Sequence, residues 1–299
     1  METQSLLDSR RRKELESLIQ LKSYLNSAQQ ETPHLFYEPT LKLLPFHKSE
    51  AQQRWIVAAN RVGKSEAGSQ EAVWYMLGEH PYKTTPAPPV SGWAVSLDYP
   101  ASVETAQEKI LKKIPPREIA SWNKNEGILK LRNGSKLGFK SCDSGWKKFQ
   151  GAEKDFIWFD EEPPNDVWKE AIIRWKRNPP DIWVTMTPVE GMTWTYSYLT
   201  GKNSEKSDID IFGATIWDNP YLNHSEIEKL TSSYSEEELQ IRLYGKYVNL
   251  SGHCVFSKKA LSAYMERTAT PKFTGFIHED RHGKLTWEEN KNGFFRIIF

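Results

Sequence analysis

The sequence predicts an α/β fold in which a mostly parallel sheet is flanked by helices. Short apolar runs of strand length alternate with segments of helical periodicity between residues 54 and 186, and this alternation is typical of βαβ units. Two of the apolar runs lead directly into polar residues, at Asn60 and at Asp160. Because ligands of such sheets bind beyond the carboxyl ends of the strands, a site is expected at these two places.

Length and composition indicate an ordinary globular protein. The 299 residues are 38% hydrophobic and 26% charged, and the formal net charge of +1 gives no overall basic field, so any nucleic-acid contact is expected from local patches. There is no apolar run of membrane-spanning length, and Arg10–Arg12 stand where a signal peptide needs apolar residues, which predicts a cytosolic protein. Cys142 and Cys254 are far apart, so neither a disulfide framework nor a zinc site is predicted.

The elements are expected in a regular order. An amphipathic helix at Leu6–Ala28 should pack through its apolar positions. Helices are then expected at Ser65–Leu77, Ala101–Ile114, Trp168–Lys176, Ser225–Ser232 and Ser235–Tyr244. Strands are expected at Arg54–Ala59, Gly92–Leu97, Phe156–Phe159 and Ile182–Met186, and a hairpin joins Ile128–Leu131 to Lys136–Lys140 through Asn133-Gly134.

The strongest motif follows the first strand of the main domain. Residues 58–65 read Ala-Ala-Asn-Arg-Val-Gly-Lys-Ser and fit the phosphate-binding P-loop pattern, except that Ala58 replaces the first glycine. Backbone amides at a helix N-terminus would hold phosphates, Lys64 would neutralise their charge, and the Ser65 hydroxyl would bind Mg²⁺. The segment expected to bind the nucleotide comprises Ala59, Asn60, Arg61, Val62, Gly63, Lys64 and Ser65.

The second half of the expected site is the apolar run that ends at Asp160, Glu161 and Glu162. In this interpretation Asp160 holds Mg²⁺ and Glu161 polarises the attacking water as general base. Glu162 remains an alternative base, and carboxylates that merely complement a helix dipole are the structural alternative. The pair of motifs predicts an ATPase with Mg²⁺ as cofactor.

A third run, Val184–Pro188, ends in hydroxyl residues and should lie beside the P-loop strand. Thr185 or Thr187 is expected to report the state of the γ-phosphate to moving parts of the protein. The alternative is a plain Thr–Pro strand exit.

These three elements together resemble the ATPase domain of bacteriophage terminase large subunits. The resemblance rests on Asn60–Ser65, Phe159–Glu162, and Thr185–Pro188 with Trp194. It continues through a helical linker at Asp218–Leu222, Arg242–Gly245 and Gly252–Phe256. It covers the chain from about Pro45 to Phe256 and implies a P-loop fold with a RecA-like core.

The resemblance implies a motor that hydrolyses ATP and drives double-stranded viral DNA into a procapsid. The implied partners are this DNA, the portal protein, the small terminase subunit and further copies of the chain in a ring, in the host cytoplasm. It also implies that Arg61 contacts phosphate and that Gln52 or Gln53 contacts adenine. The basic residue that such rings supply in trans is expected among Lys147, Lys148, Arg117 and Arg174.

The domain organisation expected from these motifs has four parts. A helical extension at 1–44 precedes the P-loop ATPase domain at 45–217, and a helical linker at 218–256 leads to a tail at 257–299. Full-length terminases continue into a nuclease, whose carboxylates are not in this sequence, so ATPase activity without nuclease activity is expected. Two alternatives remain: another P-loop translocase or helicase, and an ATP-binding assembly subunit that does not hydrolyse.

Overall fold

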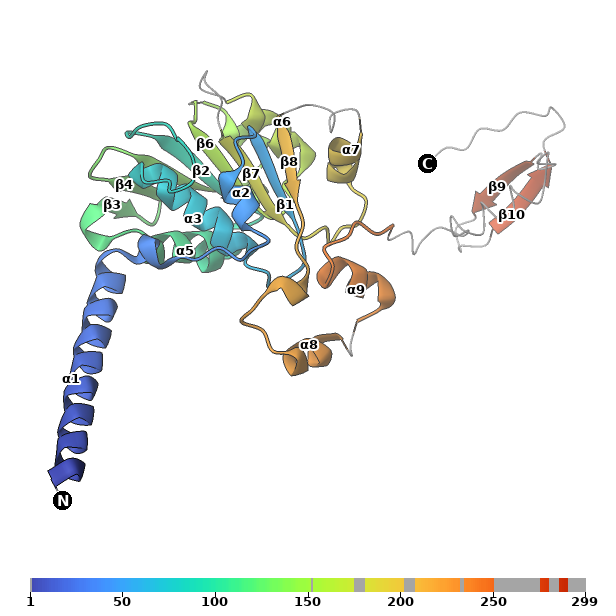
Figure 1. Cartoon of the computed structure of the whole chain (residues 1–299). Coiled ribbons are helices and arrows are strands. Elements are labelled where there is room, and N and C mark those ends of the chain that lie inside the picture. The colour runs from blue at the N-terminus through green and yellow to red at the C-terminus, as the bar shows by residue number, and fades with distance from the viewer. Residues whose placement is uncertain are drawn as a thin grey trace. The chain divides into compact units, whose positions relative to one another are not determined.

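A computed structural model describes residues 2–151, 153–174, 181–201, 208–231, 234–249, 275–279 and 285–289. Contacts divide the chain into two compact units, residues 1–250 and residues 251–299. The first unit is built on an eight-stranded sheet, and the second contains a two-stranded sheet (Figure 1).

The strand order of the large sheet is β3-β4-β5-β2-β6-β7-β1-β8. From β5 to β8 in this order the neighbours are parallel, whereas β3, β4 and β5 are joined as antiparallel neighbours. The strands are β1 Gln53–Val57, β2 Ser91–Ser96, β3 Ile119–Asn123, β4 Ile128–Leu131, β5 Lys136–Ser141, β6 Phe156–Asp160, β7 Asp181–Met186 and β8 Ile209–Phe212. The predicted α/β class with a mostly parallel sheet is confirmed.

Helices cover both faces of this sheet and enclose two apolar clusters. One cluster contains residues of α3 and α5, and the other contains residues of α6, α7 and the short helix η5. The α-helices are α1 Glu2–Glu31, α2 Leu44–Lys48, α3 Lys64–Leu77, α4 Tyr99–Ala101, α5 Glu108–Lys113, α6 Asn165–Ile172, α7 Trp194–Thr200, α8 His224–Thr231 and α9 Glu236–Arg242. Shorter helical turns are η1 Pro33–Phe36, η2 Ser102–Gln107, η3 Pro116–Glu118, η4 Cys142–Ser144, η5 Trp146–Phe149 and η7 Ile216–Asp218.

Helix α3 lies very close to the sheet at Gly68. A Cβ atom at this position would lie 2.6 Å from Cε2 of the Trp158 indole in β6, closer still to its Nε1, and 2.9 Å from the Thr185 side chain in β7. The Gly68 carbonyl also accepts a hydrogen bond of 3.1 Å from the Trp183 indole. Glycine therefore sets the distance between the helix that follows the P-loop and the strands that carry the predicted carboxylates.

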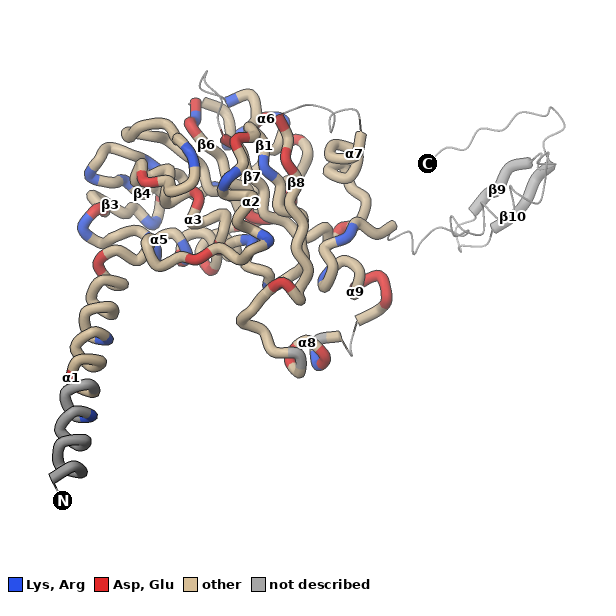
Figure 2. Tube along the Cα trace, in the orientation of Figure 1, with Lys and Arg blue, Asp and Glu red and all other residues tan. Residues whose placement is uncertain are grey.

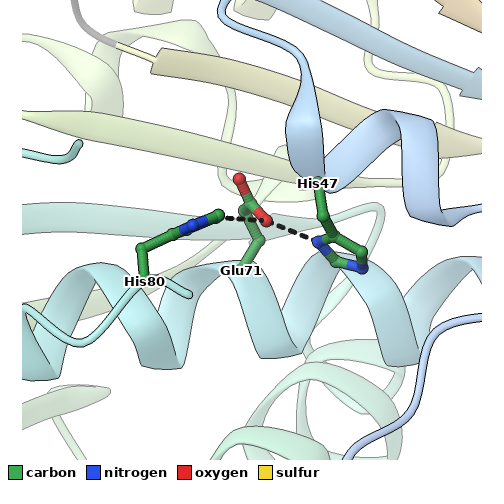
Figure 3. A group of neighbouring side chains, drawn as sticks. All are labelled: His47, Glu71 and His80. Carbon is green, nitrogen blue, oxygen red and sulfur yellow. Dashed lines mark hydrogen bonds and ion pairs between the residues drawn. The ribbon is translucent and has the colours of Figure 1, made fainter. Parts of the chain in front are cut away.

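A buried charge network ties the next turn of α3 to neighbouring elements (Figure 3). Glu71 is fully buried, and its Oε2 lies 2.7 Å from His47 Nδ1 and 3.2 Å from His80 Nε2. Its Oε1 pairs with Arg54 and, at 3.1 Å, with Lys83. Burial alone would raise the Glu71 pKa, but these cations and hydrogen bonds outweigh it and hold the pKa well below its usual range. Arg54 and Lys83 thus compensate the buried charge of the Glu71 carboxylate.

Most predicted elements are confirmed, but several expectations need correction. The strands β3 and β8 lie where no strand was predicted, and the expected helix at Ala101–Ile114 is broken by the π-helical turn η2. Helix α1 forms, yet the apolar side chains described on it are not packed in the core: Leu15 and Ile19 are 59% and 60% exposed. Periodicity predicted the helix correctly but did not reveal whether another element covers its apolar side.

The second unit is described only at β9, Gly275–Glu279, and β10, Leu285–Glu289, which pair as antiparallel strands. The linker residues Gly252–Phe256 and the tail residues Phe294–Phe299 lie outside the described residues. The four domain limits expected from the sequence therefore stay predictions. In the described part of the chain, no helix combines the length and apolar character that crossing a membrane requires.

Candidate active site

The P-loop connects the carboxyl end of β1 to the first turn of α3, as predicted. Gly63, at the N-cap of α3, has a φ of +91°, and Arg61 has a φ of +60°. Such left-handed conformations are easily adopted by glycine and are uncommon for other residues, so Arg61 marks a constrained turn. The turn presents Lys64 and Ser65 at the start of the helix.

The backbone amides of this loop divide into those that donate to a protein carbonyl and those that have no protein acceptor in the described chain. Those of Ala59 and Asn60 donate to the carbonyls of Ala214 and Arg242, at 2.9 and 2.8 Å. Within the described chain, the amides from residue 61 to residue 66 have no protein acceptor. An anion would therefore be held by the second group, which points from a helix N-terminus. The amides of Ala59 and Asn60 already have protein acceptors, and the expectation that these two residues bind the nucleotide stays a prediction.

Lys64 is buried and held by two oxygen atoms. Its Nζ donates to the carbonyl of Ala59 at 3.0 Å and to the Thr187 hydroxyl at 2.6 Å. Burial lowers the Lys64 pKa, while the charges of Glu161 and Asp160 oppose this effect. A phosphate group would replace these neutral acceptors with a charged one, which Lys64 binds more strongly.

Ser65 and Asp160 meet although they are 95 positions apart in the sequence. The Ser65 hydroxyl donates to Asp160 Oδ1 at 2.7 Å, and the Thr185 hydroxyl lies 2.9 Å from the same oxygen. Burial raises the Asp160 pKa, and these two hydrogen bonds oppose the rise. A hydroxyl and a carboxylate that converge in this way offer the hard oxygen ligands that Mg²⁺ prefers.

Glu161 and Glu162 point into different surroundings. Glu161 has a φ of +79°, its Oε2 accepts from the Thr187 amide at 3.0 Å, and burial raises its pKa. Glu162 instead accepts from the hydroxyls of Thr193 and Thr195, the latter at 3.1 Å. A left-handed glutamate held against its propensity is the kind of strain that marks functional positions. Glu161 is the better candidate for the base.

The two threonines predicted as coupling residues lie on or just after β7, which pairs in parallel with both β1 and β6. Thr185 contacts Asp160 and accepts a hydrogen bond of 2.9 Å from the Trp158 indole. Thr187 contacts Lys64, and its hydroxyl lies 2.9 Å from the Asn60 side-chain oxygen. Thr185 thus contacts the carboxylate, and Thr187 contacts the P-loop.

The P-loop lysine lines two cavities, called here the outer and the inner cavity. An outer cavity of about 510 Å³ runs from Ser65 to the aromatic side chains of Phe36 and Tyr221. An inner cavity of about 430 Å³ is lined by Lys64, Glu161 and Arg242, among others. Arg61 borders both cavities.

The helical segment after β8 packs directly on the P-loop, which the sequence did not predict. The Asn219 side chain donates to the Arg61 carbonyl, and a Cβ on Gly245 would lie 2.5 Å from the Ala58 backbone. Arg242 at the end of α9 lines the inner cavity, and its guanidinium lies over the Tyr234 ring at 5.5 Å. It has no acidic partner among the described side chains. Arg242 is thus a cation that shares this cavity with the predicted base.

The structure does not bring Gln52 or Gln53 to the P-loop. Gln53 is the first residue of β1, whereas the P-loop follows the carboxyl end of this strand. The Gln53 side-chain oxygen accepts from Tyr198 at 2.9 Å, and neither residue lines the two cavities. The adenine contact expected at Gln53 therefore stays a prediction, and it would have to form at the end of β1 that is remote from the P-loop.

The four candidates for a basic residue acting in trans differ in their surroundings. Arg174 is paired with Glu170, and Arg117 lies 3.5 Å from Glu118. Lys147 and Lys148 are exposed on η5 and make no ion pair with a described side chain. These two lysines are therefore the better placed of the four to reach another molecule.

Comparison with known proteins gives a consistent answer. Residues 55–263 match the family model described as terminase large subunit, T4likevirus-type, N-terminal. The large terminase subunit of Salmonella phage P22 is 24% identical in an alignment that covers 99% of this chain and 69% of that protein. That of Thermus virus P23-45 is 26% identical over 62% of this chain, but only 43% of its own length is covered.

Solved structures show the same fold. The large terminase ATPase domain of Thermus phage P74-26 matches with a TM-score of 0.60 and 21% identity, covering 72% of this chain and 96% of that one. The large terminase of another thermophilic bacteriophage, in complex with ADP, matches with a TM-score of 0.60 and 15% identity, covering 81% of this chain and 62% of that one.

Proposed function

The chain belongs to the N-terminal domain family of T4-like terminase large subunits and is an ATPase of the DNA-packaging kind, and we propose that its P-loop and β6 carboxylates hydrolyse ATP to drive that packaging. The observation that carries the proposal is the convergence of Lys64, Ser65 and Glu161 on the inner cavity, beside the outer cavity that Lys64 and Ser65 also line. Binding alone would not need a constrained glutamate beside the lysine.

In the proposed reaction, Glu161 accepts a proton from a water molecule in the inner cavity. The water oxygen attacks the γ-phosphorus, the bond to the oxygen that bridges the β- and γ-phosphates breaks, and ADP and phosphate leave. The raised pKa of Glu161 makes its carboxylate a stronger base. Lys64 and Arg242 line the same cavity and would offset the charge that develops on the γ-phosphate there.

Mg²⁺ fits the pair formed by Ser65 and Asp160, both of which present oxygen ligands. When bound, the ion neutralises charge on the β- and γ-phosphate oxygens. Thr185 orients the Asp160 carboxylate by its hydrogen bond of 2.9 Å. The role of this chain is to hold one carboxylate in place at the end of a buried strand.

The nucleotide base is proposed to lie in the outer cavity, as an alternative to the adenine contact expected at Gln53. Phe36 and Tyr221 line this cavity and are 41% and 80% exposed, so their rings are free to stack against a purine. Tyr221 follows Asn219, which is hydrogen-bonded to the P-loop. Base binding would therefore also position the segment that leads to Arg242.

The larger assembly is proposed from the family. A ring of chains at the portal vertex would move double-stranded DNA, with the small terminase subunit as a further partner, in the host cytoplasm. Lys147 or Lys148 would reach the neighbouring site in trans, because both are exposed cations on one short helix.

The test is steady-state ATP hydrolysis with Mg²⁺ at high protein concentration, with nucleotide binding measured in parallel. We expect wild type to hydrolyse ATP and Lys64→Ala to lose nucleotide binding, because the buried ammonium is the main cation of the loop. A matched control is Lys42→Ala, which removes an exposed lysine outside the P-loop and should leave both quantities unchanged. A wild-type chain that binds no ATP would overturn the proposal.

A further inference from the structure

The antiparallel end of the large sheet presents a row of lysines on one face. On β4 and β5, Leu129, Leu131 and Leu137 point into the apolar core, whereas Lys130 and Lys136 are exposed on the opposite face. Strand pairing sets Lys130 directly against Lys136. Lys140, four residues further along β5, lies on this face too, and Figure 2 shows basic positions around this end of the sheet.

Lys154, just before β6, extends the same surface. Its Nζ lies 5.1 Å from the centre of the Trp93 ring, and the Nζ of Lys140 lies 5.6 Å from it. The pKa of Lys154 is lowered by burial and then by the charges of Lys140 and Lys136, which only the nearby Asp155 opposes. We define Lys130, Lys136, Lys140 and Lys154 as the lysine face.

None of these four lysines makes an ion pair with a described side chain. Like charges placed directly opposite each other on neighbouring strands destabilise a sheet. By contrast, Glu66 binds Lys109 and Lys113 together, so two neighbouring lysines elsewhere in the fold share a carboxylate. Lys140 and Lys154 donate only to neutral oxygens, the Lys148 carbonyl and the Ser91 hydroxyl, and Asp155 is the one opposing charge named above. The lysine face therefore carries a net repulsion that a bound polyanion would relieve.

From this arrangement we infer that the lysine face binds the phosphate backbone of double-stranded DNA, an inference that rests on the proposed packaging function. Lysine is a flexible point charge suited to phosphates, and phosphate contacts fix a duplex without reading its sequence. The aromatic ring beside the lysines, Trp93, is 5% exposed and offers no platform on which unpaired bases could stack. The surface thus favours duplex over single-stranded DNA.

The experiment measures binding of a labelled DNA duplex of about 30 base pairs to the full chain at several salt concentrations, without ATP. For Lys130→Gln/Lys136→Gln, the slope of log K against log salt should become shallower by about 1.8, since each phosphate contact contributes about 0.9. Binding near 0.1 M salt should weaken roughly 10–100-fold on the same basis. Both side chains are exposed, so folding should be retained, and the melting temperature should be unchanged or slightly higher.

The matched control is Lys22→Gln/Lys48→Gln, which makes the same change in net charge at two exposed lysines away from the sheet face. This control variant should show the wild-type slope of log K against log salt for DNA binding. Equal binding by both double variants, or tighter binding of single-stranded DNA of the same length, would overturn the inference. So would a variant that binds DNA normally but loses self-association, because the face would then meet an acidic protein surface.

ATP hydrolysis measured on the same samples separates the two proposals. Lys130→Gln/Lys136→Gln should hydrolyse ATP at the wild-type rate in the absence of DNA, because neither residue lines the cavities. Normal hydrolysis with unaltered DNA binding refutes the lysine face alone. A wild-type chain that binds DNA through this face but does not hydrolyse ATP refutes the proposed function alone.

Discussion

Replacing Gly68 by alanine tests how closely α3 must lie on the sheet. In an ordinary helix interior this change stabilises by roughly 1 kcal/mol. Here the added Cβ would overlap the Trp158 indole at its nitrogen, and this ring is fully buried and hydrogen-bonded to Thr185. Overpacking of this kind costs about 1–3 kcal/mol. Because the ring cannot easily move, the upper value applies, and the net expectation is a loss of about 2 kcal/mol.

The assay is urea unfolding of Gly68→Ala in the wild-type and in a Trp158→Phe background. Phenylalanine lacks the indole nitrogen that the new methyl group meets, so the alanine should be less destabilising in that background. Stabilisation by Gly68→Ala, or the same loss of unfolding free energy in both backgrounds, would refute the reasoning. A shift of Trp158 would also displace Thr185 and, through Thr185, the Asp160 carboxylate. Gly68→Ala should therefore lower the apparent affinity for Mg²⁺ in ATP hydrolysis.

Three further predictions concern other parts of the structure. Glu71→Gln should lower the free energy of unfolding by about 3–5 kcal/mol, because it removes the buried carboxylate closest to Arg54 and leaves this guanidinium only the more distant Asp181, at 3.7 Å. The Glu71 pKa is lower in the folded than in the unfolded state, so the stabilisation from its ionised carboxylate is present above the unfolded pKa and is lost as the pH falls through the folded pKa. The free energy of unfolding of Glu71→Gln should therefore fall less steeply than that of wild type from about pH 5 downward. Arg242→Gln should reduce kcat roughly 10–100-fold with little change in ATP affinity, if the guanidinium acts mainly in the transition state; an unchanged kcat would contradict this. Gly245→Ala should weaken ATP binding measured by titration calorimetry, because a side chain there meets the P-loop backbone.

Much of the central site could be predicted because its signals are local. The P-loop follows a strand and opens a helix within one continuous segment, and the apolar run before Asp160 predicts a buried strand by itself. Parallel strands place such ends along one edge of a sheet, so the meeting of Ser65 and Asp160 followed from the fold class.

Other features depend on tertiary packing that the sequence pattern does not contain. Arg242 reaches the cavity of the base only because Gly245 allows the segment after α9 to approach the P-loop. The strand β8 is short and half exposed, so its pattern resembled a loop. The adenine contact expected at Gln53 by resemblance stays a prediction, because Gln53 lies at the start of β1, at the end of the strand remote from the P-loop.

The central claim, that Glu161 activates water for ATP hydrolysis, is tested most directly by comparing Glu161→Gln with Glu162→Gln. Both changes remove one carboxylate charge from adjacent residues, but only Glu161 lines the inner cavity. We predict that Glu161→Gln binds ATP with near wild-type affinity and loses turnover by at least about 100-fold, as expected for a general base, whereas Glu162→Gln keeps most of its activity. Full turnover by Glu161→Gln, or its loss in Glu162→Gln alone, would contradict the claim.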